Sequence, residues 1–129
     1  MAVRTFHIID TTLDTANEAV SGTFDFQGVT PTRVSLYVQS VESGSGATWT
    51  LTVEFSPDKG QTLIAYDKLL THDGTDAPQA SEVYTSTEDD VISISPEDVL
   101  DYIKVTATDS GSGTGSNKHA VDVWLVWTF

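Results

Sequence analysis

Residues 48–63 read TWTLTVEFSPDKGQTL, and the pattern of this stretch indicates the architecture of the protein. Apolar side chains at positions 49, 51, 53 and 55 alternate with threonine and glutamate. A period of two is typical of a β-strand with one buried face and one polar face. The segment SPDKGQT that follows is rich in turn-forming residues, so the chain is expected to reverse and pair with itself over residues 62–66. The stretch therefore predicts a β-hairpin in an all-β protein.

The same alternation recurs along most of the chain. Strands are predicted over residues 3–9, 23–27, 33–41, 48–55, 62–66, 83–85, 91–95, 101–108 and 119–128. A turn is expected at residues 21–22, and the Gly/Ser-rich segments 43–46 and 110–116 are expected to be hairpin tips. The sequence Ser95-Pro96-Glu97-Asp98 has a cap residue, a proline and an acid in the order that begins a helix, which predicts one helical turn.

About eight short strands, closely spaced turns and no amphipathic helix predict an antiparallel β-sandwich. A jelly roll is the expected topology, and an immunoglobulin-like sandwich is the alternative. The length of 129 residues fits one domain over residues 1–129, with residues 1–22 as a candidate amino-terminal arm plus the first strand. The last strand, residues 119–128, is apolar on both faces, which predicts a central position in its sheet.

The chain is strongly acidic. Nineteen Asp and Glu face six Lys and Arg, which gives a formal net charge of −13, and the basic residues form no cluster. Nucleic-acid grooves and anionic membranes both need convergent positive charge, so neither partner is expected. The sequence has no cysteine, which excludes disulfides and thiolate metal sites. The first residues lack the continuous apolar core of a secretory signal, so no secretion is expected.

The turn at residues 56–62 resembles the Asp-box of sialidases, Ser-x-Asp-x-Gly-x-Thr, and its expected role is structural. The carboxylate of Asp58 is expected to accept amide hydrogens of the turn, and Gly60 is expected to adopt a positive φ. The hydroxyls of Ser56 and Thr62 are expected to satisfy nearby backbone groups. A sialidase site would need three arginines around a carboxylate substrate, and this chain contains only two.

The sequence shows no pattern of catalytic or metal-ligating residues. His7, His72 and His119 lack the close spacing of a zinc site, and no Gly-x-Ser-x-Gly elbow supports a nucleophilic serine. We therefore predict no catalytic residue, no metal and no cofactor, and a hydrolase is the least favoured class. The acidic stretch between residues 69 and 103 contains no Lys or Arg and lacks the Asp-x-Asp-x-Asp-Gly spacing of a calcium loop. Residues 88–90 and 97–98 are therefore interpreted as solvated turns, and an acidic surface that docks onto a basic partner is the second interpretation. The nine acidic residues of the stretch are Asp73, Asp76, Glu82, Glu88, Asp89, Asp90, Glu97, Asp98 and Asp101.

Tryptophan is abundant near the carboxyl end of the sequence. Trp124 and Trp127 stand at positions of opposite parity, so they point to opposite faces of the last strand. An indole that leaves the core is either covered by another subunit or exposed as a ligand platform. Trp124, Trp127 and Phe129 are therefore the candidate interface residues.

Three segments together resemble small virion structural proteins of tailed bacteriophages: residues 48–62, residues 101–108 and the closing residues 119–129. The resemblance covers residues 33–129 and brings no catalytic residue. It implies a non-enzymatic capsid decoration or cement protein that binds the major capsid protein as a homo-oligomer, with a trimer favoured. It also implies a place in the virion after assembly in the host cytoplasm. The alternative is a carbohydrate-binding module or an adhesin-like sandwich, which would require an exposed aromatic platform.

Overall fold

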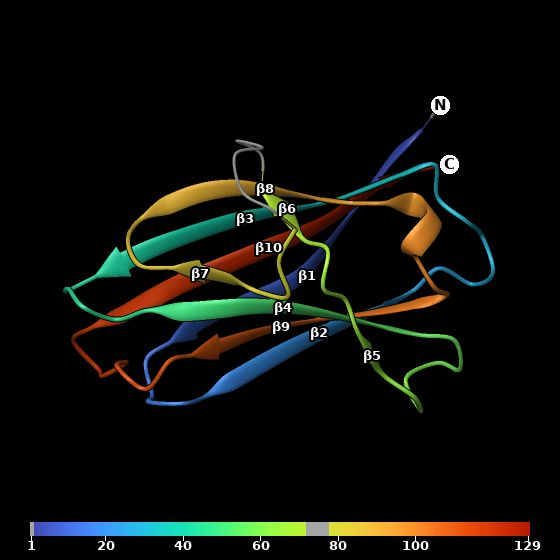
Figure 1. The fold of residues 1–129 in the computed structure, drawn as a ribbon. Helices are drawn as coiled ribbons and strands as arrows, with labels where there is room; N and C mark the ends of the chain where they lie inside the picture. Colours follow the sequence, from blue (N-terminus) through green and yellow to red (C-terminus); the bar gives the residue numbers. More distant parts are fainter. Residues whose placement is uncertain (1, 72–77) are drawn as a thin grey trace.

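The computed structural model describes residues 2–71 and 78–129, which form two antiparallel sheets of five strands stacked as a sandwich (Figure 1). The first sheet has the order β1-β10-β3-β8-β6, and the second has the order β2-β9-β4-β5, with β7 also paired to β4. The strands are β1 (Val3–Leu13), β2 (Ala19–Asp25), β3 (Arg33–Ser43), β4 (Trp49–Ser56), β5 (Ile64–Ala65), β6 (Leu70–Thr71), β7 (Glu82–Tyr84), β8 (Glu88–Ile94), β9 (Tyr102–Asp109) and β10 (Lys118–Thr128). A single 3₁₀ turn, η1 (Pro96–Asp98), lies between β8 and β9 within the described ranges.

The pairing of the strands is nested. β1 pairs with β10, β2 with β9, β3 with β8 and β4 with β7, so the first half of the chain runs in reverse order along the second half. Rolled into two sheets, this nested pairing is that of an eight-stranded jelly roll, with the two-residue strands β5 and β6 inserted between β4 and β7. The structure thus confirms the antiparallel sandwich and its single helical turn, and it favours the jelly roll over the immunoglobulin-like alternative.

The Gly/Ser-rich loops connect the two sheets. The loop at residues 43–46 joins β3 of the first sheet to β4 of the second, and the loop at 110–116 joins β9 to β10. The prediction that both are hairpin tips is therefore wrong, because turn-forming composition shows where a chain bends but not which strand it then pairs with. Among the described strands, only β4 and β5 are consecutive in sequence and also paired with each other.

The amino-terminal residues belong to the sheets. Of the segment 1–22, expected as a candidate arm plus the first strand, β1 pairs with residues 119–128 of β10 and the start of β2 pairs with β9. The turn expected at residues 21–22 is instead at residues 14–18, where the Glu18 carboxylate accepts the backbone N–H groups of Asp14 and Thr15. Gly22 lies within β2, and a Cβ there would stand 1.8 Å from the carbonyl oxygen of Ile8. The glycine therefore allows the edges of the two sheets to approach closely.

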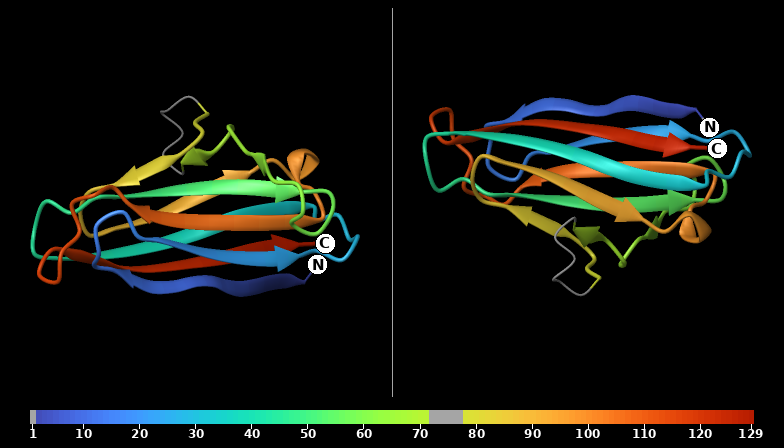
Figure 2. Two further views of the ribbon diagram at one scale, coloured as in Figure 1. Left: turned by 90° about the horizontal axis from the view of Figure 1, so that it is seen from below. Right: turned by 90° about the horizontal axis from the view of Figure 1, so that it is seen from above.

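The inner faces of both sheets form one apolar core. β10 lies between β1 and β3, as its apolar pattern predicts, and its odd-numbered positions 121, 123 and 125 are fully buried. Each buried Leu or Ile contributes on the order of 1.5–3 kcal/mol of transfer free energy. The two ends of the chain lie at the same end of the sandwich, as all views show (Figure 2). The described residues contain no helix of the length and apolarity that a membrane crossing requires.

Candidate functional site

Trp127 is a core residue at the end of the sandwich where the chain ends meet. Its side chain is 7% exposed, and its ring centroid lies 4.5 Å from that of Phe24 and 5.9 Å from that of Phe26. Phe129 packs on it at 6.4 Å and remains 43% exposed, and Phe6, 41% exposed, contacts Phe24 at 5.3 Å. The cluster therefore continues from a buried indole to two partly exposed phenylalanine rings.

Trp124 lies on the outer face of the first sheet. Its residue is half-buried, and its indole is stacked on the imidazole of His7, with ring centroids 4.7 Å apart and an interplanar angle of 9°. The strand register places Tyr37 of β3 on its other side, and Tyr37 is 45% exposed. Cross-strand aromatic neighbours of this kind stabilise a sheet surface and present flat apolar area to a partner.

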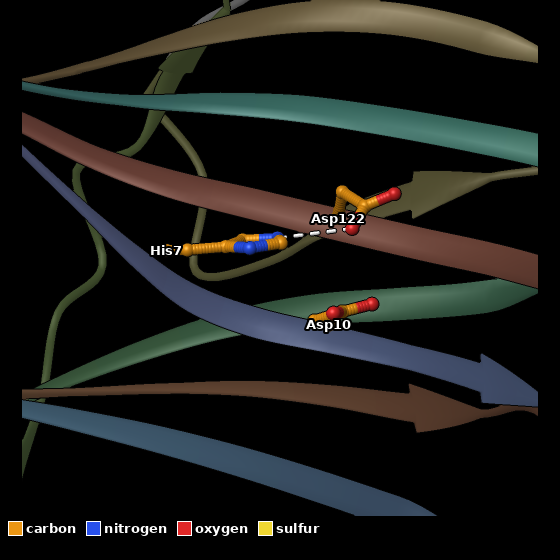
Figure 3. A group of neighbouring side chains, drawn as sticks. All are labelled: His7, Asp10 and Asp122. Atoms are coloured by element: carbon orange, nitrogen blue, oxygen red, sulfur yellow. Dashed lines mark hydrogen bonds and ion pairs between the residues drawn. The ribbon is translucent and has the colours of Figure 1, made fainter.

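A group of polar side chains adjoins this aromatic row. The Nε2 atom of His7 lies 2.9 Å from Oδ1 of Asp122, and the carboxylate of Asp10 is close to both (Figure 3). One ligand atom from each of the three residues lies within 4.8 Å of the other two. His7 and Asp10 come from β1 and Asp122 comes from β10, so the group bridges two adjacent strands of the first sheet.

A β-bulge explains why His7 and Asp10 share one face. The register of β1 against β10 shifts between His7 and Ile9, and both Ile8 and Ile9 are buried. In a regular strand, positions 7 and 10 would point to opposite faces, because side chains alternate with a period of two. The extra residue at Ile8 places His7 and Asp10 on the same face, and β-bulges commonly redirect side chains in this way. The sequence signal of the bulge is the consecutive apolar pair Ile8-Ile9 in an otherwise alternating segment.

The other histidine that the structure describes is structural. His119 is 1% exposed, its Nδ1 lies 2.9 Å from Oγ of Ser40, and its Nε2 lies 2.8 Å from the carbonyl oxygen of Ala47. Trp49, fully buried, donates its indole N–H to the same Ser40 oxygen at 2.9 Å. These bonds hold the loop between β3 and β4 against β10. His72 lies outside the described residues.

The turn after β4 has the hydrogen bonds that its residue types favour. Oδ1 of Asp58 accepts the backbone N–H of Thr62 at 2.7 Å and the hydroxyl of Ser56 at 2.7 Å. The Ser56 oxygen accepts the N–H of Gly60 at 2.8 Å, and Gly60 has a φ of 92°. Hydrogen bonds from Thr62 and Ser56 hold the pKa of Asp58 below its ordinary value. The arrangement closes the β4–β5 hairpin and leaves the carboxylate occupied within the turn.

The acidic stretch is not made of turns alone: that prediction is wrong for residues 88–90, which begin β8 and pair with β3. Its described carboxylates do not belong to any group of three converging ligands, whereas Asp73 and Asp76 lie outside the described residues. Oδ2 of Asp98 accepts the hydroxyl of Tyr66 at 3.2 Å, and Oδ2 of Asp90 accepts that of Tyr84 at 2.9 Å. Burial raises the pKa of the Tyr84 hydroxyl far above its ordinary value, and the nearby Asp90 charge adds to the shift.

Comparison with known proteins supports the fold. No family model matches the sequence, and no curated protein matches it. The solved structure of infectious bursal disease virus, Gx strain, aligns with 98% of this chain at 16% identity and a TM-score of 0.52. This chain spans 32% of that much longer chain. The acid-stable capsid of Helicobacter pylori bacteriophage KHP30 aligns with 92% of this chain and 93% of its own at 15% identity, but its TM-score of 0.25 is too low to indicate a shared fold.

Proposed function

We propose that this protein is a non-enzymatic structural component of a virus particle, a capsid decoration or cement protein that self-associates and binds the major capsid protein. The observation that supports it best is the jelly roll, which aligns over nearly its whole length with part of a protein of infectious bursal disease virus. Viral capsid domains use this architecture, and so do lectins. Because one fold serves several functions, the surface of the sandwich has to distinguish between them.

The candidate interface is the aromatic end of the sandwich, and its occupant is a second copy of this chain. Phe129 packs on Trp127, Trp127 contacts Phe24, and Phe24 contacts Phe6, so the two exposed rings are joined through the core cluster. Each copy carries a formal net charge of −13, so copies repel one another except where apolar surface is buried between them. The exposed aromatic rings are therefore the favoured place for self-association, and aromatic residues are enriched at interface cores. A trimer is the state that we expect.

Trp124 serves as a second contact, on the outer face of the first sheet. A sugar platform needs an open indole face, but the imidazole of His7 covers one face of this indole and the strand register places Tyr37 on its other side. This contact favours a protein interface over the carbohydrate-binding alternative. The acidic surface provides the electrostatic complement to a basic area on the major capsid protein, where it would raise the rate and selectivity of docking.

Sedimentation equilibrium and capsid binding test the proposal. The parent is expected to sediment as about three times the 13.9 kDa chain, and Phe129→Ser is expected to be a monomer. Val83→Ser is the matched control, because Val83 is 57% exposed on β7 and is not part of the cluster. The parent should also bind capsids of the encoding virus from which this protein has been removed. A parent that stays monomeric and does not bind such capsids would refute the proposal, and Trp124-dependent binding on a glycan array would support the alternative.

A further inference from the structure

We propose that His7, Asp10 and Asp122 bind one divalent transition-metal ion, Zn²⁺ by preference, on the outer face of the first sheet. The ligands are Nε2 of His7 and one carboxylate oxygen each from Asp10 and Asp122. The site is independent of the virion proposal, since it follows from side chains on β1 and β10 alone.

The spacing of the three atoms fits a single ion. Zinc binds imidazole nitrogen and carboxylate oxygen at about 2.0–2.2 Å, so two ligands of a tetrahedral ion stand roughly 3.3 Å apart. His7 Nε2 and Asp122 Oδ1 are already 2.9 Å apart, and all three atoms lie within 4.8 Å of one another. Small rotations of exposed carboxylates therefore complete the triangle, and no movement of the strands is needed.

The backbone is shaped to bring these groups together. The bulge at Ile8 places His7 and Asp10 on the same face of β1, and the register sets Asp10 directly opposite Asp122. The outward direction of Asp10 thus depends on an irregularity within the pairing of the first strand with the last. The stacked indole of Trp124 also holds the imidazole plane, which is the kind of support that neighbouring groups give to a metal ligand.

The local charge favours a cation. Two carboxylates directly opposite each other on neighbouring strands repel, and such pairs destabilise a sheet. Among the described residues, the ion pairs made by lysine go to Asp25 and Asp98, so neither Asp10 nor Asp122 has a Lys or Arg partner. The hydrogen bond from His7 reaches only one of the two carboxylates. A bound cation would offset the repulsion between both.

The donor set selects the class of ion. Calcium and magnesium take oxygen ligands in larger numbers, whereas one imidazole with two carboxylates suits zinc and its neighbours in the transition series. Three protein ligands leave a fourth position for water or for a side chain of another molecule.

Isothermal titration of the 129-residue chain with zinc chloride tests the site, and Co²⁺ absorption reports the geometry of the bound ion. We expect one ion per chain and an increase in melting temperature on adding zinc, but no increase with Mg²⁺ at the same concentration. Asp10→Asn, Asp122→Asn and His7→Ala should each weaken binding at least tenfold. Because Asp10→Asn also removes a repulsion, its melting temperature without metal should not fall, which separates lost ligation from misfolding.

Two variants serve as controls. Asp89→Asn removes a carboxylate from the same row of the sheet, where Gln39 separates it from Asp122, and it should bind zinc as the parent does. His72→Ala should also bind as the parent does, which would exclude that imidazole as the ligand. The proposal is overturned if millimolar zinc does not bind, or if the three ligand variants bind zinc as tightly as Asp89→Asn.

Discussion

Ser40 joins two buried side chains, and its replacement by alanine gives the sharpest test of how the core is organised. In the neutral ring of His119, Nε2 carries the hydrogen, because it lies 2.8 Å from the Ala47 carbonyl oxygen, which can only accept. The Nδ1 atom is then an acceptor, so Ser40 donates to it while accepting the indole N–H of Trp49. One hydroxyl thus satisfies a donor and an acceptor that have no access to water.

The expected cost of Ser40→Ala follows from these two bonds. The substitution removes one oxygen and leaves almost no cavity, but it leaves both the Trp49 N–H and the His119 Nδ1 unpaired. Each unsatisfied buried group costs about 1–3 kcal/mol, which gives a total loss of about 2–6 kcal/mol in the free energy of unfolding. For a chain of this length, that loss corresponds to a decrease of roughly 8–24 °C in melting temperature.

Urea unfolding followed by tryptophan fluorescence measures the loss, and Ser35→Ala is the matched control. Ser35 lies on the same strand and is 7% exposed, and within the described residues its hydroxyl has no hydrogen bond. Its replacement should change stability by less than about 1 kcal/mol.

A double-mutant cycle with Trp49→Phe isolates the bond from the indole. Since the phenyl ring has no donor, Ser40→Ala should cost about 1–3 kcal/mol less in that background. If Ser40→Ala costs no more than Ser35→Ala, or if the cost is the same with Phe at position 49, the hydrogen bonds do not stabilise the core as argued.

Three further predictions concern the close approach of the sheets, the hairpin turn and the buried tyrosine. Gly22→Ala should cost about 1–3 kcal/mol or more by chemical denaturation, because its Cβ would meet the Ile8 carbonyl, whereas Gly115→Ala, with open space around it, should change little. Asp58→Asn should melt below the parent at neutral pH. Since the folded-state pKa of Asp58 is lowered below 3.8, the stabilisation is present above that pH and the difference should disappear in acid-series melts as pH falls through the folded-state pKa. Tyr84 has a raised folded-state pKa, so its contribution is complete below pH 10.0 and decreases above it by about 1.4 kcal/mol per pH unit. Alkaline titration of stability should therefore be flatter for Tyr84→Phe, and an unchanged slope would contradict this assignment.

The sequence predicts the strands well because burial alternates along them. β9 and β4 are neighbouring strands in the second sheet, and each shows strict alternation of buried and half-buried residues over most of its length. The pattern carries less information about pairing. A serine- and glycine-rich loop such as residues 110–116 has the same composition whether it joins neighbouring strands of one sheet or crosses between sheets. The sequence is therefore compatible with both the jelly roll and the immunoglobulin-like topology.

The period-two alternation that predicts the strands does not predict the candidate metal ligands. Strict alternation assigns His7 and Asp10 to opposite faces, and Asp122 is more than a hundred residues away in sequence, so no local spacing relates the three. Only the bulge at Ile8 changes the parity of β1, and only the pairing of the first strand with the last sets Asp10 opposite Asp122.

The bulge also turns the Ile8 carbonyl toward Gly22, so one irregularity both closes the sheet edges and aims the polar group. A bulge bends and twists its strand, so the neighbouring strand must leave room for the displaced backbone. Gly22 leaves this room, because it has no side chain opposite the Ile8 carbonyl. A variant that straightens β1, by deleting Ile8, should therefore both weaken zinc binding and lower the stability of the sandwich, whereas Asp10→Asn should affect binding alone.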